Sequence, residues 1–167
     1  LDKVRPGGII AYVTSSGTLD KQDESARRYI AQRARLLGAV RLPYTSMLKD
    51  GGTEVTADIL FLQKLDAPSR DEPEWLHVGQ TEDGITLNRY FISHPDMMMG
   101  TMGYSKHRMY GREGQTALFP AENWEEKLAE AVHSIHGQYV PALPSPDALE
   151  KNRPGIPTDG VRMYGYT

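Results

Sequence analysis

An unbroken apolar run from Gly8 to Thr14 constrains the fold of this chain more than any other stretch. The run is rich in Ile and Val, follows the turn residues Pro6 and Gly7, and lacks the polar alternation of a half-buried strand. It therefore predicts a β-strand that is covered on both faces, as strands are in α/β sheets.

The residues after this run predict one helix and two further strands. Apolar residues recur at helical spacing from Ser25 to Leu37, and Gly38 is well placed to end that helix. Residues Gly38–Pro43 and Ala57–Gln63 predict strands, with a break at Asp50–Gly52. The order strand, helix, strand, strand indicates the α/β class, with the helix as the crossover of a βαβ unit.

Composition excludes several classes of site. The 167 residues include no cysteine, which excludes disulfides, thiolate metal sites and cysteine nucleophiles, and which suits a cytoplasmic protein. A net charge of −3 gives no overall attraction to nucleic acid, so a DNA contact requires a local basic patch. No stretch approaches the roughly 20 apolar residues of a membrane span, so we expect no membrane partner.

The charged, proline-bearing segment Asp66–Glu74 predicts a boundary in the chain. We expect a first part over residues 1–65, an α+β extension over 66–140 and a Pro/Gly-rich linker or tail over 141–167. The elements expected in the extension are short strands at Trp75–Val78 and Ile85–Leu87, short helices at Asn88–His94 and Pro95–Met99, a hairpin over Thr101–Phe119 and a helix over Ala121–His136.

Three pieces of the first part carry a family resemblance. They are the Pro6–Gly8 lead into the first strand, the Leu42–Pro43 pair, and Thr53–Gln63 (TEVTADILFLQ). In this order they resemble the C-terminal half of the N6-adenine DNA methyltransferases related to the modification subunits of type I restriction systems. In that family a Pro-Gly-Gly-led strand is the fifth of a seven-stranded sheet, and the next two strands form its antiparallel edge.

The resemblance implies a partial Rossmann-like methyltransferase sheet (β-α-β-β) followed by the extension. The parent protein would transfer a methyl group from S-adenosylmethionine to adenine in DNA. The family's glycine loop and its Asn/Asp-Pro-Pro-aromatic motif would lie before Leu1, so we expect a fragment without catalytic residues or a bound cofactor of its own. Residues Asn88–Met102 also resemble a segment of the methylase–helicase proteins of phages and mobile elements.

The resemblance also implies where a flipped adenine base would lie. Ligands bind at the carboxyl ends of the strands in such sheets, so Thr14, Ser15 and Ser16 would line the cleft. The loop over Pro43–Glu54 would lie beside the base. Met47 and Leu48 stand near the position where phenylalanine is common in the family, so either Tyr44 would serve instead or the loop would only pack. The cations expected to contact DNA phosphates are Lys49, Lys106, His107, Arg108 and Arg112.

Other interpretations stay open. A non-catalytic DNA- or protein-binding module with the same strand order is the main alternative, and a small-molecule or RNA methyltransferase relative is the third. We expect no metal site, because His133 and His136 share a helix face without an obvious third ligand. The expected partners are DNA, the missing N-terminal methyltransferase half, and a second copy of the chain paired through the exposed first strand.

Overall fold

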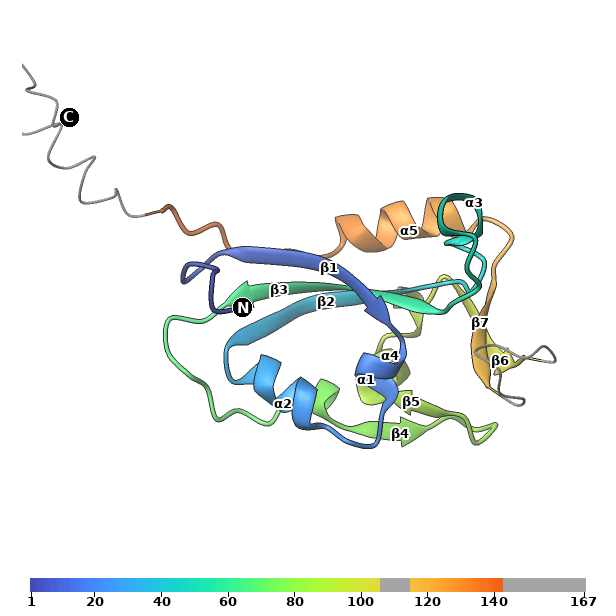
Figure 1. The fold of residues 1–167 in the computed structure, drawn as a ribbon, viewed down its shortest axis with the longest axis horizontal. Helices are drawn as coiled ribbons and strands as arrows, with labels where there is room; N and C mark the ends of the chain where they lie inside the picture. The colour runs from blue at the N-terminus through green and yellow to red at the C-terminus, as the bar shows by residue number, and fades with distance from the viewer. Residues whose placement is uncertain (106–114, 143–167) are drawn as a thin grey trace, which may run out of the picture.

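A three-stranded sheet organises the chain in the computed structural model, which describes residues 1–105 and 115–142 (Figure 1). Its strands are β1 (Ile9–Ser15), β2 (Ala34–Leu42) and β3 (Ala57–Lys64), in the order β1-β3-β2. β3 runs antiparallel to both neighbours, so β1 and β2 run parallel to each other with β3 between them. The predicted strands are confirmed, but β1 and β2 are not direct neighbours as they are in a simple βαβ unit.

Helices lie on both sides of this sheet. Figure 1 shows α1 (Gly17–Asp20), α2 (Ser25–Ala31) and α4 (Arg89–Ser93) on one side, and α5 (Trp124–His133) on the other. The architecture is therefore mixed α/β. No helix of the described residues combines the length and the apolar character that crossing a membrane requires.

Helix α2 is shorter than the sequence predicts. It ends at Ala31, and the stretch predicted as its last turns begins β2 at Ala34. Ala34, Arg35 and Leu36 pair with β3, and a bulge at Leu37 shifts the register before Gly38. The prediction that Gly38 ends the helix is wrong, because pairing with β3 outweighs the helical spacing of these residues.

The remaining elements follow β2 and β3. They are α3 (Leu48–Gly51), the 3₁₀ helices η1 (Glu74–Leu76) and η2 (Pro95–Met97), and the strands β4 (Val78–Gln80), β5 (Thr86–Asn88), β6 (Gly100–Tyr104) and β7 (Thr116–Pro120). β4 pairs with β5 and β6 with β7, each antiparallel. The predicted hairpin over Thr101–Phe119 is confirmed in its two strands, whereas its turn lies outside the described residues. Trp75 and Leu76, predicted as strand, form η1 instead.

One apolar core joins the first part of the chain to the extension. Leu60 and Leu62 of β3 are fully buried and belong to the same cluster as Leu76, Phe91 and Leu118. Burying large side chains of this kind contributes about 1.5–3 kcal/mol each. The sheet is therefore stabilised by residues on both sides of the expected boundary at residue 66.

The outer edge of β2 is protected by the extension. The Ala39 amide donates to the Tyr90 hydroxyl over 3.1 Å, and the Arg41 carbonyl accepts a hydrogen bond from the Met99 amide at 3.0 Å. Just beyond the strand, the Tyr44 amide donates to the Leu118 carbonyl. This edge therefore has little capacity to pair with another chain along these residues.

The outer edge of β1 is unprotected by comparison. Within residues 1–105 and 115–142, β3 is the one strand that pairs with β1. Ile9 and Val13, which share a face of β1, are each 52% exposed. Within the described residues, β1 is therefore not covered on both faces as predicted, and this apolar strand keeps both an open edge and an open face.

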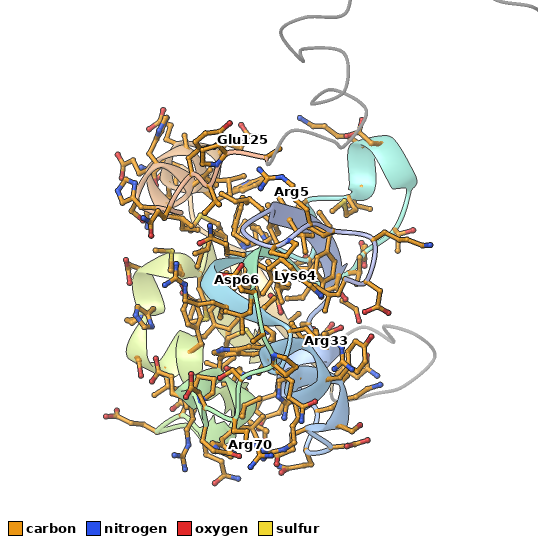
Figure 2. The ribbon with its side chains drawn as sticks, turned by 90° about the vertical axis from the view of Figure 1, so that its left-hand side faces the viewer. Arg5, Arg33, Lys64, Asp66, Arg70 and Glu125 are labelled. Carbon is orange, nitrogen blue, oxygen red and sulfur yellow. The ribbon has the colours of Figure 1, made fainter. Side chains whose placement is uncertain are left out.

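The segment after α5 lies at the end of the sheet where β1 begins and β3 finishes. Arg5 donates to the Val140 carbonyl over 2.6 Å, and the Gln63 side chain donates to the Gln138 carbonyl over 2.5 Å. Figure 2 shows Arg5, Lys64 and Asp66 gathered near this end, where β1 begins and β3 finishes. The expected tail over 141–167 lies outside the described residues except for its first two positions.

Gly100 is where a small side chain is required most strictly. A Cβ there would lie 1.8 Å from the Phe119 carbonyl oxygen, and a backbone atom has little freedom to move aside. We expect Gly100→Ala to lower the free energy of unfolding by about 1–3 kcal/mol. Gly51→Ala is the control, since nothing lies within 4 Å of its Cβ position. Urea unfolding of both variants tests this, and equal stabilities would contradict it.

Candidate functional site at the carboxyl end of the sheet

One end of the sheet is formed by the last residues of β1 and β2 and the first residues of β3. Ser15 pairs with Ala57, which also pairs with Leu42. The Ser16 amide donates to the Thr56 carbonyl over 3.1 Å, so the turn after β1 lies directly beside the loop that leads into β3. The structure thus brings the two predicted groups, Thr14–Ser16 and the loop over 43–54, to the same end of the sheet.

The three hydroxyl residues at the end of β1 differ in their surroundings. Thr14 Oγ1 lies 2.6 Å from Thr18 Oγ1, so this hydroxyl is engaged within the chain. Ser15 is exposed, and Ser16 precedes α1 without a side-chain capping bond. Ser15 is therefore the residue of the three that is most available to a ligand.

The loop residues are partly committed to packing. The Tyr44 ring meets Phe119 edge to face, with centroids 5.4 Å apart and planes at 68°. Met47 is half-buried against the core, and Lys49 is exposed in α3. The Tyr44 ring is thus already in contact with Phe119, whereas Lys49 is exposed and can meet a phosphate without rearrangement.

Four of the predicted DNA-contacting cations lie outside the described residues. They are Lys106, His107, Arg108 and Arg112, which come between β6 and β7 in the sequence. These two strands are paired as far as Tyr104 and Thr116. Contact of these four cations with DNA stays a prediction.

A buried charge cluster lies near this end of the sheet, and the sequence did not lead us to expect it. Arg41 in β2 and Asp58 in β3 are both fully buried. Arg41 Nε and Nη2 donate to the two oxygens of Asp58 over 2.7 and 2.9 Å. Its Nη1 donates to Asp20 over 2.7 Å, and its guanidinium lies 4.4 Å from the Phe91 ring centroid.

The charges in this cluster hold one another. Burial by itself lowers the pKa of Arg41, but Asp58 and Asp20 outweigh it and the pKa is raised, so Arg41 stays charged. Burial raises the pKa of Asp58, and its two hydrogen bonds from Arg41 act in the opposite direction. The cluster therefore fixes β2, β3 and α1 relative to one another at the end of the sheet.

Asn88 extends the cluster into the extension. Its amide N–H donates to Asp20 over 3.0 Å, and its side-chain nitrogen donates to the carbonyls of Leu19 and Trp75 over 2.8 and 2.9 Å. Its side-chain oxygen accepts a hydrogen bond from the Tyr90 amide at the start of α4. One buried side chain thus joins α1, η1 and α4.

A signal for this cluster exists in the sequence. Arg41 and Asp58 are opposite charges inside two segments that otherwise predict buried strands. Charged side chains are almost never fully buried unless they are paired. An arginine and an aspartate inside two neighbouring buried strands therefore predict that the two side chains pair with each other.

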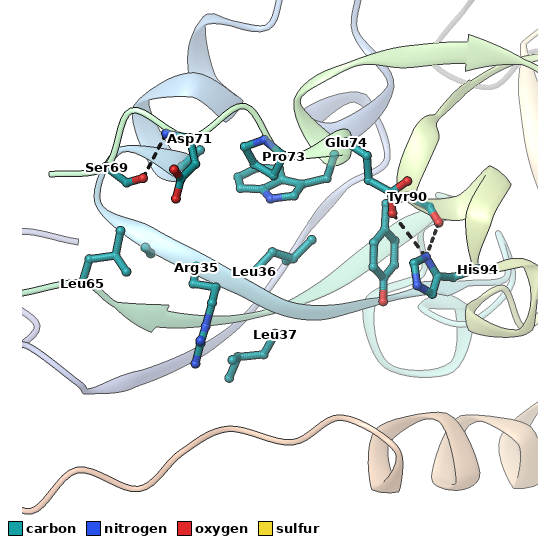
Figure 3. Close-up of a pocket in the computed structure, with 13 residues that line it drawn as sticks. Arg35, Leu36, Leu37, Leu65, Ser69, Asp71, Pro73, Glu74, Tyr90 and His94 are labelled. Carbon is teal, nitrogen blue, oxygen red and sulfur yellow. Dashed lines mark hydrogen bonds and ion pairs between the residues drawn. The ribbon is translucent and has the colours of Figure 1, made fainter.

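A cavity of about 500 Å³ lies away from this end of the sheet, beside the first residues of β2 (Figure 3). Trp75, Tyr90 and Leu65 contribute to its walls, and His94 stacks on Tyr90 with ring centroids 4.5 Å apart. Burial raises the pKa of Tyr90, whose hydroxyl accepts the Ala39 hydrogen bond. None of the predicted site residues lines this cavity.

Two features that would hold a metal ion or a nucleotide cofactor can be compared with the described residues. Within 1–105 and 115–142, no three side chains of His, Asp or Glu converge as metal ligands. The turn between β1 and α1 has the single glycine Gly17, where an added Cβ would meet nothing closer than 3.7 Å. This turn does not have the glycine-rich form that cradles a nucleotide cofactor.

No family model, curated protein or solved structure matches this chain.

Proposed function

We propose that this chain is the edge of the sheet of a DNA adenine-N6 methyltransferase. Its role in that proposal is to close one side of the cleft into which the adenine base is flipped. The methyl group would come from S-adenosylmethionine, held by another part of the protein, since the turn after β1 does not fit this cofactor. The observation that carries the proposal is the open edge and open apolar face of β1.

The composition of β1 supports this role. Its sequence is that of a strand buried on both faces, yet Ile9 and Val13 are half exposed within the described residues. A strand with an unpaired edge and exposed apolar side chains is a template for a further strand. The remainder of a larger sheet is an occupant that satisfies the edge and the face together.

The strand arrangement supports it too. The family resemblance leads us to expect an antiparallel edge after the Pro-Gly-Gly-led strand. β3 runs antiparallel to β1 and β2, and the outer edge of β2 is closed by Tyr90 and Met99. The sheet can therefore grow on the β1 side alone along these residues.

The chain's own groups at the cleft would act by positioning. Ser15 offers a free hydroxyl to the base or its sugar, and Lys49 offers a cation to a phosphate. The Arg41–Asp58 pair would hold the strand ends in place without touching the base, because both residues are fully buried. These groups support base binding, and none of them replaces the acceptors that hold the adenine amino group.

The test uses the full product of the gene that encodes this chain. We expect it to transfer tritiated methyl groups from S-adenosylmethionine to DNA, with N6-methyladenine identified by mass spectrometry of the nucleosides. Val13→Lys should reduce the rate at least about tenfold, because the lysine charge would be buried when the rest of the sheet covers β1. Tyr139→Lys is the matched control, since Tyr139 is exposed outside the sheet.

Methylation of cytosine, of RNA or of a small molecule would overturn the adenine proposal. Absence of any methyl transfer by a folded full-length product would leave the non-catalytic binding module as the better interpretation. A Val13→Lys variant as active as the wild type would show that β1 is not covered in the active protein.

A further inference from the structure

Arg27 in α2 is a buried cation that pairs directly with no carboxylate of the described residues. Its residue exposure is 1%, and its guanidinium donates from Nε to the Leu76 carbonyl over 2.7 Å and from Nη1 to the Thr18 carbonyl over 3.2 Å. Its Nη2 has no hydrogen-bond partner within residues 1–105 and 115–142. Leaving a buried charged donor unpaired costs more than leaving a neutral one unpaired, so this nitrogen requires an explanation.

A polar cavity of about 340 Å³ adjoins this residue. The residues that line it are Gln22, Glu24, Arg27, His77, Val78 and Arg89. Arg89 is exposed, and its guanidinium makes no hydrogen bond or ion pair with the described part of the chain. The cavity is therefore lined by a buried guanidinium and an exposed one, together with an amide, an imidazole and the carboxylate of Glu24.

The one carboxylate in this cavity is already engaged. Glu24 accepts a hydrogen bond from Arg28 and lies 3.1 Å from His77 Nδ1. Arg28 also pairs with Glu72 outside the cavity. Burial lowers the pKa of Arg27, whereas the more distant charges of Glu24, Asp20 and Asp23 raise it. A ligand with its own negative charge would meet two guanidinium groups here and a carboxylate whose charge is shared.

We propose that this cavity binds a phosphate group, with Arg27 Nη2 and the Arg89 guanidinium as its main donors. Two planar guanidinium groups suit an anion with several acceptor oxygens, and charge-assisted hydrogen bonds of this kind are among the strongest in proteins. The phosphate would belong either to the backbone of a nucleic acid or to a small phosphorylated molecule. The inference is independent of methyl transfer, because it rests on α2, β4 and α4 rather than on β1.

Inorganic phosphate is the first probe. We expect its titration at constant ionic strength to shift the amide resonances of His77 and Val78 and to raise the melting temperature. Arg89→Gln should weaken phosphate binding at least about tenfold, because it removes one charge-assisted contact without disturbing the buried residues. Arg70→Gln is the matched control, since Arg70 is exposed in a loop outside the cavity.

A short DNA duplex identifies the source of the phosphate. Competition between duplex and inorganic phosphate for the same amide shifts, weakened by Arg89→Gln, assigns the cavity to a nucleic-acid phosphate. Phosphate binding that the duplex does not displace assigns it to a small phosphorylated molecule. The proposal is overturned if phosphate produces no saturable shift, or if wild type and Arg89→Gln bind phosphate equally well.

The Arg27→Gln variant tests the buried donor itself. Circular dichroism first establishes that the variant is folded. A folded variant should lose phosphate binding more completely than Arg89→Gln, and unchanged binding would overturn the role of Nη2. If Arg27→Gln does not fold, the comparison of Arg89→Gln with Arg70→Gln decides alone.

Discussion

Replacing Arg41 by Met is expected to lower the free energy of unfolding by about 3–5 kcal/mol, because the carboxylates of Asp20 and Asp58 lose the cation that they share. Asp58 is fully buried and loses two hydrogen bonds, and Asp20 loses one. The free energy of unfolding in urea, measured at neutral pH, tests this expectation.

Two companion variants separate charge from packing. Arg35→Met removes an arginine from the same strand. Arg35 is exposed, and within the described residues its one side-chain partner is Gln63, so we expect a change of at most about 1 kcal/mol. The double variant Arg41→Met/Asp58→Leu should be more stable than Arg41→Met alone, because it removes the stranded carboxylate with its partner. A double variant that is less stable would contradict the unpaired charge as the cause.

Asn88→Ala is expected to cost about 3 kcal/mol, through several lost hydrogen bonds rather than through lost volume. It leaves the carbonyls of Leu19 and Trp75 without their donor, and it removes the acceptor that caps α4 at Tyr90. We expect native-state hydrogen exchange to quicken most in α1, η1 and α4, the three elements that Asn88 joins. Urea unfolding measures the overall loss.

Asn123→Ala provides the matched control. Asn123 also precedes a helix, α5, but its side chain makes no capping hydrogen bond. We therefore expect a change within about 0.5 kcal/mol. Equal losses at Asn88 and Asn123 would show that the buried bonds of Asn88 contribute little.

Local signals in the sequence predicted several elements well. Asn88 at the start of α4 and Pro95 at the first position of η2 act through their own backbone neighbours, so no knowledge of distant residues is needed. The apolar run of β1 and the strand-like run of β3 after the break at Asp50–Gly52 also predicted strands that the structure has. The resemblance also led us to expect Thr14–Ser16 and the loop after β2 at the same end of the sheet, because ligands bind at the carboxyl ends of the strands in such sheets.

The misses have long-range causes. Ala34–Leu37 has helical spacing, but pairing with β3, almost thirty residues later in the chain, makes it a strand. The pairing of Arg41 with Asp58 depends on the strand order β1-β3-β2, which was not predicted. The unpaired nitrogen of Arg27 depends on where Leu76 and Thr18 lie. Apart from the two opposite charges of Arg41 and Asp58 inside predicted strands, the sequence pattern contains none of this information.

The hydrogen bond from Arg5 to the Val140 carbonyl has a consequence for the order of folding. A ribosome must synthesise almost all of the described chain before this contact can form, whereas β1, β2 and β3 are all complete by Lys64. Contacts between residues so distant in sequence form slowly, because closing a long loop has a large entropic cost. The contact between Arg5 and the segment after α5 should therefore form only after the three strands have paired, because β3 alone can hold the start of β1.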